Sequence, residues 1–502
     1  MHRTKSLLPV LFLFSLMSLG CSQPDTQYTL SPTATPTTLT AIGAELDAHF
    51  HAQHVPRSAG ASADDWERIV VPRIASMGLQ SLRVMVLPTW YEPVNDNDDP
   101  DLLAPDAFTF DSEEMQGVYR VLDTAEQLGI AVTIVPWGAY RDTFLAPGTS
   151  GWVVAPTDLP EYAENLTALM HHLVDVKGYG CIAELTPMNE PDGHRMEPAD
   201  YVVLCCLLRD RLQREGLLGR FRLDLIDSTD QGGSYGYLQT ASEGLKDIAD
   251  VINSHTYIFG YDTPTSRIVE WERENSRLAA AIGVRHRVGE FGSNLCVGAS
   301  RQQDIDWYSR GVLIVRNALA LLAGGASGVS YWQLFDQYYA RTDSYAQMQQ
   351  LGMWRSVRDD YASEEYYADL VADYQPRPQY YAYSLLTRFI RPGADIYALD
   401  VDTATVARYP LNCALAAHNV DGTWVYVLAN MDEEATLDVA FHNPLAPTSS
   451  RYERYLYADD HLPTDDSQLP PDARHLRTTA LSGALRTTVP PNSVVLLRTA
   501  TH

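Results

Sequence analysis

The sequence predicts a (β/α)8 TIM barrel followed by a smaller all-β sandwich domain. Three observations carry this prediction. Eight short apolar runs, each followed by a longer amphipathic stretch, lie between residues 41 and 390. No glycine-rich G-x-G-x-x-G or P-loop pattern follows the first run, which favours a closed barrel over an open doubly wound sheet. From residue 391 onward the pattern changes to short alternating segments separated by turn residues, and 502 residues exceed what one core usually supports.

The barrel elements follow in a regular order. We expect strands at residues 42–46, 81–86, 131–136, 182–188, 221–227, 251–255, 286–291 and 328–334, because these runs are short, apolar and rich in β-branched residues. Between them, apolar residues recur at helical spacing over residues 64–77, 112–128, 159–176, 198–214, 237–248, 266–282 and 304–322. A last helix is expected near residues 380–389.

The sandwich is predicted over residues 391–502. Segments 414–418, 423–429, 437–441, 451–457 and 493–498 alternate in polarity and are bounded by Gly, Pro, Asn and Asp. Only a short Arg-Pro-Gly joint at 391–393 separates them from the barrel, so we expect the sandwich to pack on the barrel. A separate carbohydrate-binding module is the alternative.

The first forty residues are expected to serve export. Residues 1–21 combine Arg3 and Lys5 with an apolar run and end at Gly20-Cys21, which is typical of a bacterial lipoprotein signal whose cysteine is lipidated. Ser18 departs from that pattern, so cleavage and secretion without an anchor is the alternative. Residues 22–40 are rich in Thr, Pro and Ser, and we expect a linker that acts as a spacer. The protein is then a cell-surface or periplasmic lipoprotein, or is secreted.

Charge and cysteine content narrow the class of partner. The formal net charge of -27 repels nucleic acid and anionic membranes and leaves neutral ligands such as sugars, with the N-terminal lipid as the only membrane contact. The cysteine spacing matches no zinc or redox motif, so neither a metal site nor a cofactor is indicated. The oligomeric state is left open.

Two glutamates stand at the ends of predicted strands. Glu190 lies in ELTPMNEPDG after the fourth strand, and Glu290 lies in HRVGEFGSN at the end of the seventh. In barrels of this type the active site is built from residues at the carboxyl ends of the strands. Cleavage of a glycosidic bond needs one carboxylic acid and one carboxylate, so the pair predicts this chemistry.

Several motifs together resemble clan A glycoside hydrolases, the retaining barrel enzymes of families 5, 30 and 39. Asn189-Glu190-Pro191 is similar to the Asn-Glu pair of that clan, Gly289-Glu290-Phe291-Gly292 to its nucleophile motif, and His255-Thr256-Tyr257 to its His-x-Tyr. Arg83 on the second strand and Trp332 on the eighth complete the resemblance, which covers residues 40–390. The histidine that many family 5 members carry after the third strand is absent, since this chain reads IVPWGAYRD there.

The resemblance implies roles for eight residues. Glu190 would be the acid/base and Glu290 the nucleophile; the substrate-binding residues would be Arg83, Trp137, Asn189, His255, Tyr257 and Trp332. Three have structural alternatives that stay open. Arg83 could be a buried ion-pair partner of Glu45 or Glu184, His255 a core histidine, and Trp332 a packing residue.

The sequence therefore predicts a retaining hydrolase of β-glycosidic bonds in polysaccharides or oligosaccharides. An endo-acting β-glucanase or mannanase is favoured, because Trp90, Tyr91, Trp137, Tyr140, Tyr338, Tyr339 and Trp354 could line a cleft. An exo-acting β-glycosidase is the alternative, since the long segment 336–373 could close the cleft into a pocket. A non-catalytic carbohydrate-binding lipoprotein is the alternative from another class.

Overall fold

The computed structural model describes residues 26–48, 64–93, 108–137, 139–140, 153–229, 236–297, 301–342, 345–355, 373–446, 451–462, 474–477 and 484–499. Eight parallel strands close into a barrel, which confirms the predicted fold class. Chain order around the barrel is β3 (Ala41–Asp47), β4 (Ser81–Val86), β5 (Ala131–Pro136), β8 (Ile182–Leu185), β9 (Arg222–Ser228), β10 (Val251–Thr256), β11 (Arg285–Phe291) and β14 (Gly328–Tyr331). All eight fall within two residues of the predicted starts, and only β8 and β14 end earlier than expected.

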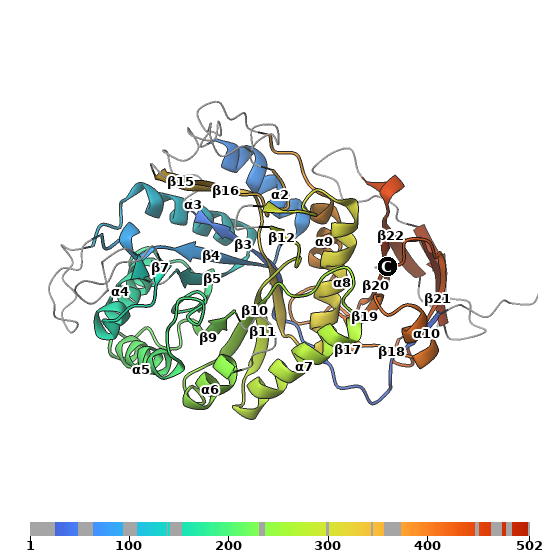
Figure 1. Cartoon of the computed structure of the whole chain (residues 1–502), viewed down its shortest axis with the longest axis horizontal. Helices are drawn as coiled ribbons and strands as arrows, with labels where there is room; N and C mark the ends of the chain where they lie inside the picture. Colours follow the sequence, from blue (N-terminus) through green and yellow to red (C-terminus); the bar gives the residue numbers. More distant parts are fainter. Residues whose placement is uncertain are drawn as a thin grey trace, which may run out of the picture.

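Helices surround the barrel on its outer side (Figure 1). They are α2 (Val71–Met77), α3 (Glu113–Leu128), α4 (Leu159–His171), α5 (Pro198–Arg214), α6 (Gly236–Gly244), α7 (Thr265–Ala281), α8 (Tyr308–Gly324) and α9 (Pro378–Phe389). A π-helical turn at Trp66–Val70 precedes α2, another at His172–Val176 follows α4, and a 3-10 turn spans Pro88–Trp90. Local signals set the ends: the Ser112 hydroxyl accepts the Met115 N–H at 3.2 Å where α3 begins, and Gly129 adopts φ 68° after its last residue.

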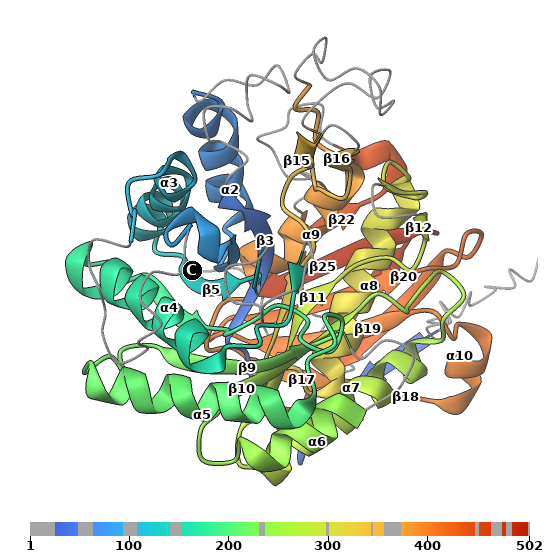
Figure 2. The same cartoon turned by 60° about the vertical axis from the view of Figure 1, so that its left-hand side comes forward.

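Several loops contain two-stranded antiparallel sheets. These are β6 (Ala139–Tyr140) with β7 (Val153–Val154), β12 (Cys296–Val297) with β13 (Arg301–Gln302), and β15 (Gln337–Thr342) with β16 (Tyr345–Gln349). The last pair belongs to the segment 336–373, which was expected as a loop. Part of that segment therefore folds as a hairpin after β14, as Figure 2 shows.

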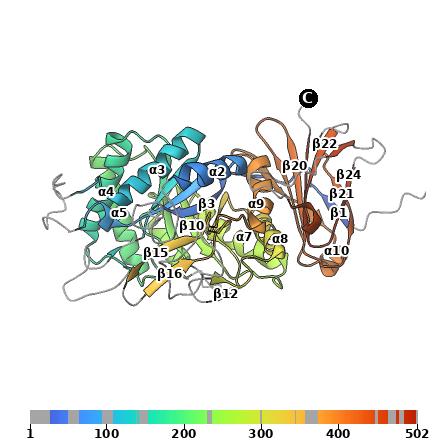
Figure 3. The same ribbon diagram turned by 90° about the horizontal axis from the view of Figure 1, so that it is seen from above.

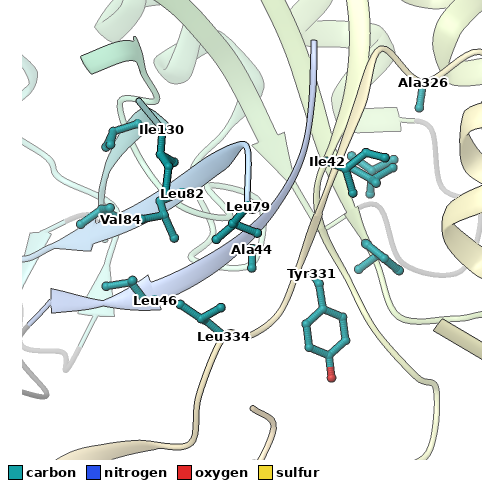
Figure 4. Close-up of a cluster of buried hydrophobic side chains, with 14 of the residues drawn as sticks. Ile42, Ala44, Leu46, Leu79, Leu82, Val84, Ile130, Ala326, Tyr331 and Leu334 are labelled. Carbon is teal, nitrogen blue, oxygen red and sulfur yellow. The ribbon is translucent and has the colours of Figure 1, made fainter. Parts of the chain in front are cut away.

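Side-chain alternation along the strands separates the core from the barrel interior. Ile42, Ala44 and Leu46 of β3 lie with Leu82 and Val84 of β4 in the apolar layer under the helices (Figure 4). The residues between them, such as Glu45 and Arg83, point to the other face because the side-chain period of a strand is two. The barrel interior is consequently lined with charged groups.

The sandwich consists of two sheets. The seven-stranded sheet has the order β2 (Thr37–Thr38), β17 (Asp395–Ala398), β19 (Cys413–His418), β20 (Trp424–Asn430), β25 (Ser493–Thr499), β22 (Arg451–Tyr457) and β23 (Arg474–Arg477). The four-stranded sheet has the order β18 (Asp400–Val401), β1 (Thr26–Thr29), β21 (Leu437–His442) and β24 (Ala484–Val489). A short helix α10 (Thr403–Arg408) and a 3-10 turn (Asp459–His461) complete this part of the chain.

The larger sheet is buried on both faces. Along β20, Val425 and Val427 belong to the core shared with the barrel helices, whereas Tyr426 and Leu428 belong to the core between the two sheets. Helices α8 and α9 lie between the barrel and this sheet (Figure 3), and the Tyr308 ring stacks on Tyr457 at 4.9 Å. The sandwich therefore packs on the barrel, as the short joint between them suggested.

The expected spacer at residues 22–40 differs from the structure. Thr26–Thr29 forms β1, which pairs with β21 and β18, and Thr37–Thr38 pairs with β17. Composition was misleading here because Tyr28 and Leu30 are buried in the sandwich core, where Tyr28 stacks on Phe441 at 5.7 Å. The predicted signal at 1–21, with Cys21, lies outside the described residues. Within the described part of the chain, no helix combines the length and apolar character needed to cross a bilayer.

Candidate active site

The structure brings Glu190 and Glu290 together at the carboxyl end of the barrel. Glu190 follows β8 and Glu290 lies in β11, and His255 of β10 stands between them. Its Nδ1 lies 2.9 Å from Glu190 Oε1 and 3.5 Å from Glu290 Oε2. Oxygens of the two carboxyl groups lie within 4.8 Å of each other. The two carboxyl groups are thus close neighbours, as they must be where one carboxylate attacks the sugar directly.

Glu290 is surrounded by hydrogen-bond donors. Arg83 Nη1 donates to its Oε1 at 2.5 Å, and the Tyr257 hydroxyl donates to its Oε2 at 2.7 Å. Its side chain is only 5% exposed. A charge-assisted bond and an opposite charge both favour the ionised carboxylate, so this glutamate is prepared to act as an anion.

Glu190 has a different environment. Its side chain is 26% exposed, and its backbone adopts φ 43°, which is unusual for a residue with a side chain. The Glu190 N–H donates to the Asp227 carbonyl at 3.1 Å, and its own carbonyl accepts the His194 N–H at 3.1 Å. Hydrogen bonds therefore fix the backbone at this residue, while its side chain stays partly exposed.

Arg83 crosses the barrel interior from β4. It pairs with Glu45 of β3, Asp227 of β9 and Glu290 of β11, and its Nη2 also donates to Asn189 Oδ1 at 2.8 Å. Arg83 is therefore a buried ion-pair partner of Glu45 and also contacts Glu290, while its role in binding substrate stays a prediction. Burial raises the pKa of Glu45 well above its ordinary value; Arg83 opposes this shift, and the nearby Glu290 adds to it.

The other expected partner of Arg83 belongs to a separate network. Glu184 pairs with Arg287 and Arg222, and Arg287 also contacts Asp224 at 3.0 Å. This second network joins side chains of β8, β9 and β11. It does not share a hydrogen bond or ion pair with Arg83 among the described residues.

His255 is fully buried but is more than a core histidine. Its two ring nitrogens each lie 2.9 Å from a carboxylate oxygen, Nδ1 from Glu190 and Nε2 from Asp227. Burial alone would lower the pKa of His255, but the charges of Glu290 and Asp227 and the hydrogen bonds to Asp227 and Glu190 raise it well above 6.5. These contacts favour the doubly protonated ring.

Trp332 and Trp137 lie in a small apolar cluster at the barrel mouth. Trp332 packs with Met85, Val135 and Leu351, and Trp137 and Tyr257 are packed against this group. Trp332 is 7% exposed, so the structure shows its packing role directly. Its use as a sugar platform remains a prediction.

Two of the seven aromatic residues that were expected to line a cleft are buried in the core. Tyr91 and Trp354 are buried in the core, because the Tyr91 hydroxyl donates to Asn165 and the Trp354 ring packs between Phe335 and Tyr380. Trp90 is 9% exposed, while the side chains of Tyr140, Tyr338 and Tyr339 lie outside the description. The sequence analysis missed Trp307, which is 50% exposed and lies next to Tyr261.

One further residue of the charged site, Asp227, was not singled out from the sequence. It binds both Arg83 and His255. For Asp227 the available signal was an acidic residue at the carboxyl end of the apolar run RLDLIDS. The same reasoning that selected Glu190 and Glu290 applies to that position.

Known proteins resemble this chain in fold but not in sequence. No family model and no curated protein matches the sequence. Among solved structures, the fold is similar to the catalytic domain of GH30 xylanase C from Talaromyces cellulolyticus, with a TM-score of 0.63 and 17% identity over 95% of this chain and 100% of that chain. A GH30 endoxylanase from Clostridium papyrosolvens matches with a TM-score of 0.61 and 14% identity over 95% and 100% of the two chains. An endo-β-1,6-glucanase matches with 0.62 and 16% over 95% and 94%.

The chain has the barrel-and-sandwich fold of these structures. These identities are low, and the similarity covers the sandwich as well as the barrel. The resemblance inferred from the motifs around Glu190 and Glu290 and the shared architecture agree with each other. Activity on a sugar is a separate question.

Proposed function

We propose that the protein is a retaining glycoside hydrolase that cleaves β-glycosidic bonds by double displacement. The observation that carries this proposal is the pair of close carboxyl groups in unequal surroundings. Glu290 is buried and bonded by Arg83 and Tyr257, and Glu190 is partly exposed. Two carboxyl groups with different environments are what an acid and a nucleophile need.

In the first step Glu290 attacks the anomeric carbon while the Glu190 carboxylic acid donates its proton to the leaving oxygen. The bond from the anomeric carbon to that oxygen breaks, and a glycosyl ester forms on Glu290. In the second step Glu190, now ionised, takes a proton from water, and the resulting attack on the anomeric carbon releases Glu290. Glu290 enters the first step as an anion and leaves the second step as one, and Arg83 and Tyr257 would stabilise that charge.

The substrate is proposed to be a polymer, with endo-β-glucanase or mannanase activity as the first candidate. Trp307 supports this choice. It lies in the connection between β11 and α8, and its half-exposed ring could bind a sugar unit remote from the cleaved bond. Enzymes of similar fold include xylanases and an endo-β-1,6-glucanase, so both linkages belong among the substrates tested. An exo-acting β-glycosidase is the second candidate, favoured by the hairpin β15–β16 after the last barrel strand.

The test is hydrolysis of β-1,4- and β-1,6-glucans, mannan, xylan and aryl β-glycosides by the purified protein. Glu290→Ala should abolish activity. Glu190→Ala should lose activity on polymers but recover it on activated aryl substrates when azide replaces the missing base, with a β-glycosyl azide as product. Products that retain the β configuration are expected, and inverted products would refute the double displacement.

Exo and endo action differ in the same assay. An endo enzyme lowers the viscosity of a soluble glucan before much reducing sugar appears, and Trp307→Ala should weaken action on the polymer more than on an aryl glycoside. Binding to polysaccharide without hydrolysis of any substrate would instead support a carbohydrate-binding protein.

Export and lipid attachment at Cys21 are also proposed, on the evidence of the N-terminal sequence alone. Incorporation of a labelled fatty acid by the wild type and not by Cys21→Ser would support the anchor. Release of unlabelled mature protein into the medium would contradict it and favour secretion.

A further inference from the structure

Asp227 occupies an irregular position at the end of β9. Asn253 of β10 pairs with Ile226 and Ser254 pairs with Ser228, so Asp227 is an extra residue that the neighbouring strand does not match. Ile226 and Asp227 adopt φ 82° and 51°, in the left-handed region that β-branched residues rarely enter. Bulges and such backbone outliers persist where they redirect a side chain, and they are frequent beside active sites.

The bulge places Asp227 in contact with three other members of the site. Its Oδ2 accepts a hydrogen bond from Arg83, and its Oδ1 lies 2.9 Å from His255 Nε2. Its backbone carbonyl accepts the Glu190 N–H at 3.1 Å. The side chain is fully buried, so these contacts are not weakened by solvent.

These contacts join the two halves of the proposed catalytic pair. Arg83, which binds Asp227, also donates to Glu290 Oε1. His255, which contacts Asp227 through Nε2, also contacts Glu190 Oε1 through Nδ1. Among the described residues, Asp227 alone has hydrogen bonds to Arg83, to His255 and to the Glu190 backbone. Loss of its charge would leave the two buried cations with less anionic compensation.

We propose that Asp227 is the positioning residue of this site, which fixes Arg83 and His255 in one arrangement and keeps the imidazole of His255 doubly protonated. The inference rests on the proposed function only for its kinetic consequence. The groups that face His255 are Asp227 from β9, Glu190 after β8 and Glu290 from β11, with Arg83 and Glu45 as the further charges nearby. Because both ring nitrogens lie against carboxylate oxygens, each is placed to donate a proton.

The direct test needs no substrate. In the wild type labelled with 15N-histidine, the His255 ring should keep both protons at pH 8, with its signals assigned by their loss in His255→Gln. In Asp227→Asn, which keeps the size of the side chain but not its charge, the ring should titrate at least one pH unit lower. A neutral His255 in the wild type at pH 8 overturns the inference even if the variant does not fold. Unchanged titration in the variant overturns it as well.

Asp224→Asn is a matched control. Asp224 lies in the same strand and is equally buried, but it pairs with Arg287. A general effect of removing a buried carboxylate would lower the stability of both variants, and only Asp227→Asn should change the titration of His255.

The kinetic test uses the substrate identified above. Asp227→Asn should lower kcat about 100-fold with little change in KM, as expected when reacting groups are misplaced by small distances. The alkaline limb of its pH–activity profile should also lie at lower pH than that of the wild type. Asp224→Asn should keep the wild-type profile. Wild-type kinetics in Asp227→Asn would refute the positioning role. If the wild type hydrolyses no glycoside, the proposed function fails, and the histidine titration still decides the inference.

Discussion

Replacing Tyr257 by phenylalanine removes one hydrogen bond and little else. The hydroxyl of Tyr257 donates to Glu290 Oε2 at 2.7 Å, and the ring packs against the apolar cluster that contains Trp332. Phenylalanine keeps that ring and its packing. Glu290 would keep its bond from Arg83 but lose the donor on its second oxygen.

The size of the effect follows from the kind of bond lost. A hydrogen bond to a charged group contributes about 1.5 to 3 kcal/mol. If this stabilisation serves the reacting carboxylate, kcat/KM on an aryl β-glycoside falls by roughly 10- to 150-fold.

Tyr261→Phe is the matched control for this measurement. The Tyr261 hydroxyl donates to the carboxylate of Asp304 at 2.9 Å, so the substitution also removes one phenol–carboxylate bond from the loop after β10. Asp304 pairs with Arg310 and is not part of the glutamate site. If the two variants lose activity equally, or Tyr257→Phe retains wild-type kcat/KM, the assignment of Tyr257 to the nucleophile is wrong.

Three further predictions concern stability and fit. Arg83→Met leaves Glu45, Asp227 and Glu290 without their shared cation, and we expect a loss of about 3 to 5 kcal/mol in the free energy of unfolding, larger at pH 7 than at pH 4, in urea titrations. An equal loss at both pH values would contradict the charge argument. Burial alone would raise the pKa of Asp227, but Arg83 and His255 lower it from 3.8 to about 2. The ionised carboxylate therefore contributes roughly 2 kcal/mol to the free energy of unfolding above pH 4, and this contribution is lost as the pH falls to 2. Asp227→Asn should lack this part of the acid dependence. Gly289→Ala should cost about 1 to 3 kcal/mol and reduce activity, because the added Cβ would lie 2.6 Å from Asn253 Oδ1 and 3.0 Å from Asp227 Oδ1; a fully active, stable variant would show that these groups can move aside.

The barrel could be predicted because its signals are local. Strands such as Ser81–Val86 and Ala131–Pro136 were placed to the residue by apolar runs, and α5 (Pro198–Arg214) by its helical spacing and leading proline. The glutamates were found because the carboxyl ends of parallel strands meet at one face. These inferences need no knowledge of distant contacts.

The parts that sequence analysis missed depend on distant contacts. Thr26–Thr29 becomes a strand only because Leu437–His442, more than four hundred residues later, offers it a partner. Tyr91 and Trp354 look like cleft residues in the sequence, yet their burial is decided by Asn165 and Tyr380. The contacts of Asp227 depend on a backbone bulge, and the residue types of β9 do not predict that bulge.

The glycines on either side of Glu290 illustrate how such distant contacts explain a local motif. Gly289 and Gly292 are not among the glycines with positive φ, so conformational freedom does not account for them. Both are instead sites of close approach: an added Cβ would lie 3.0 Å from Asp227 Oδ1 at position 289 and 2.9 Å from Tyr257 Cε1 at position 292. Asp227 and Tyr257 are two of the groups that organise the charges around Glu290. The Gly-Glu-Phe-Gly motif therefore provides the space in which the donors and charges of the site surround the candidate nucleophile.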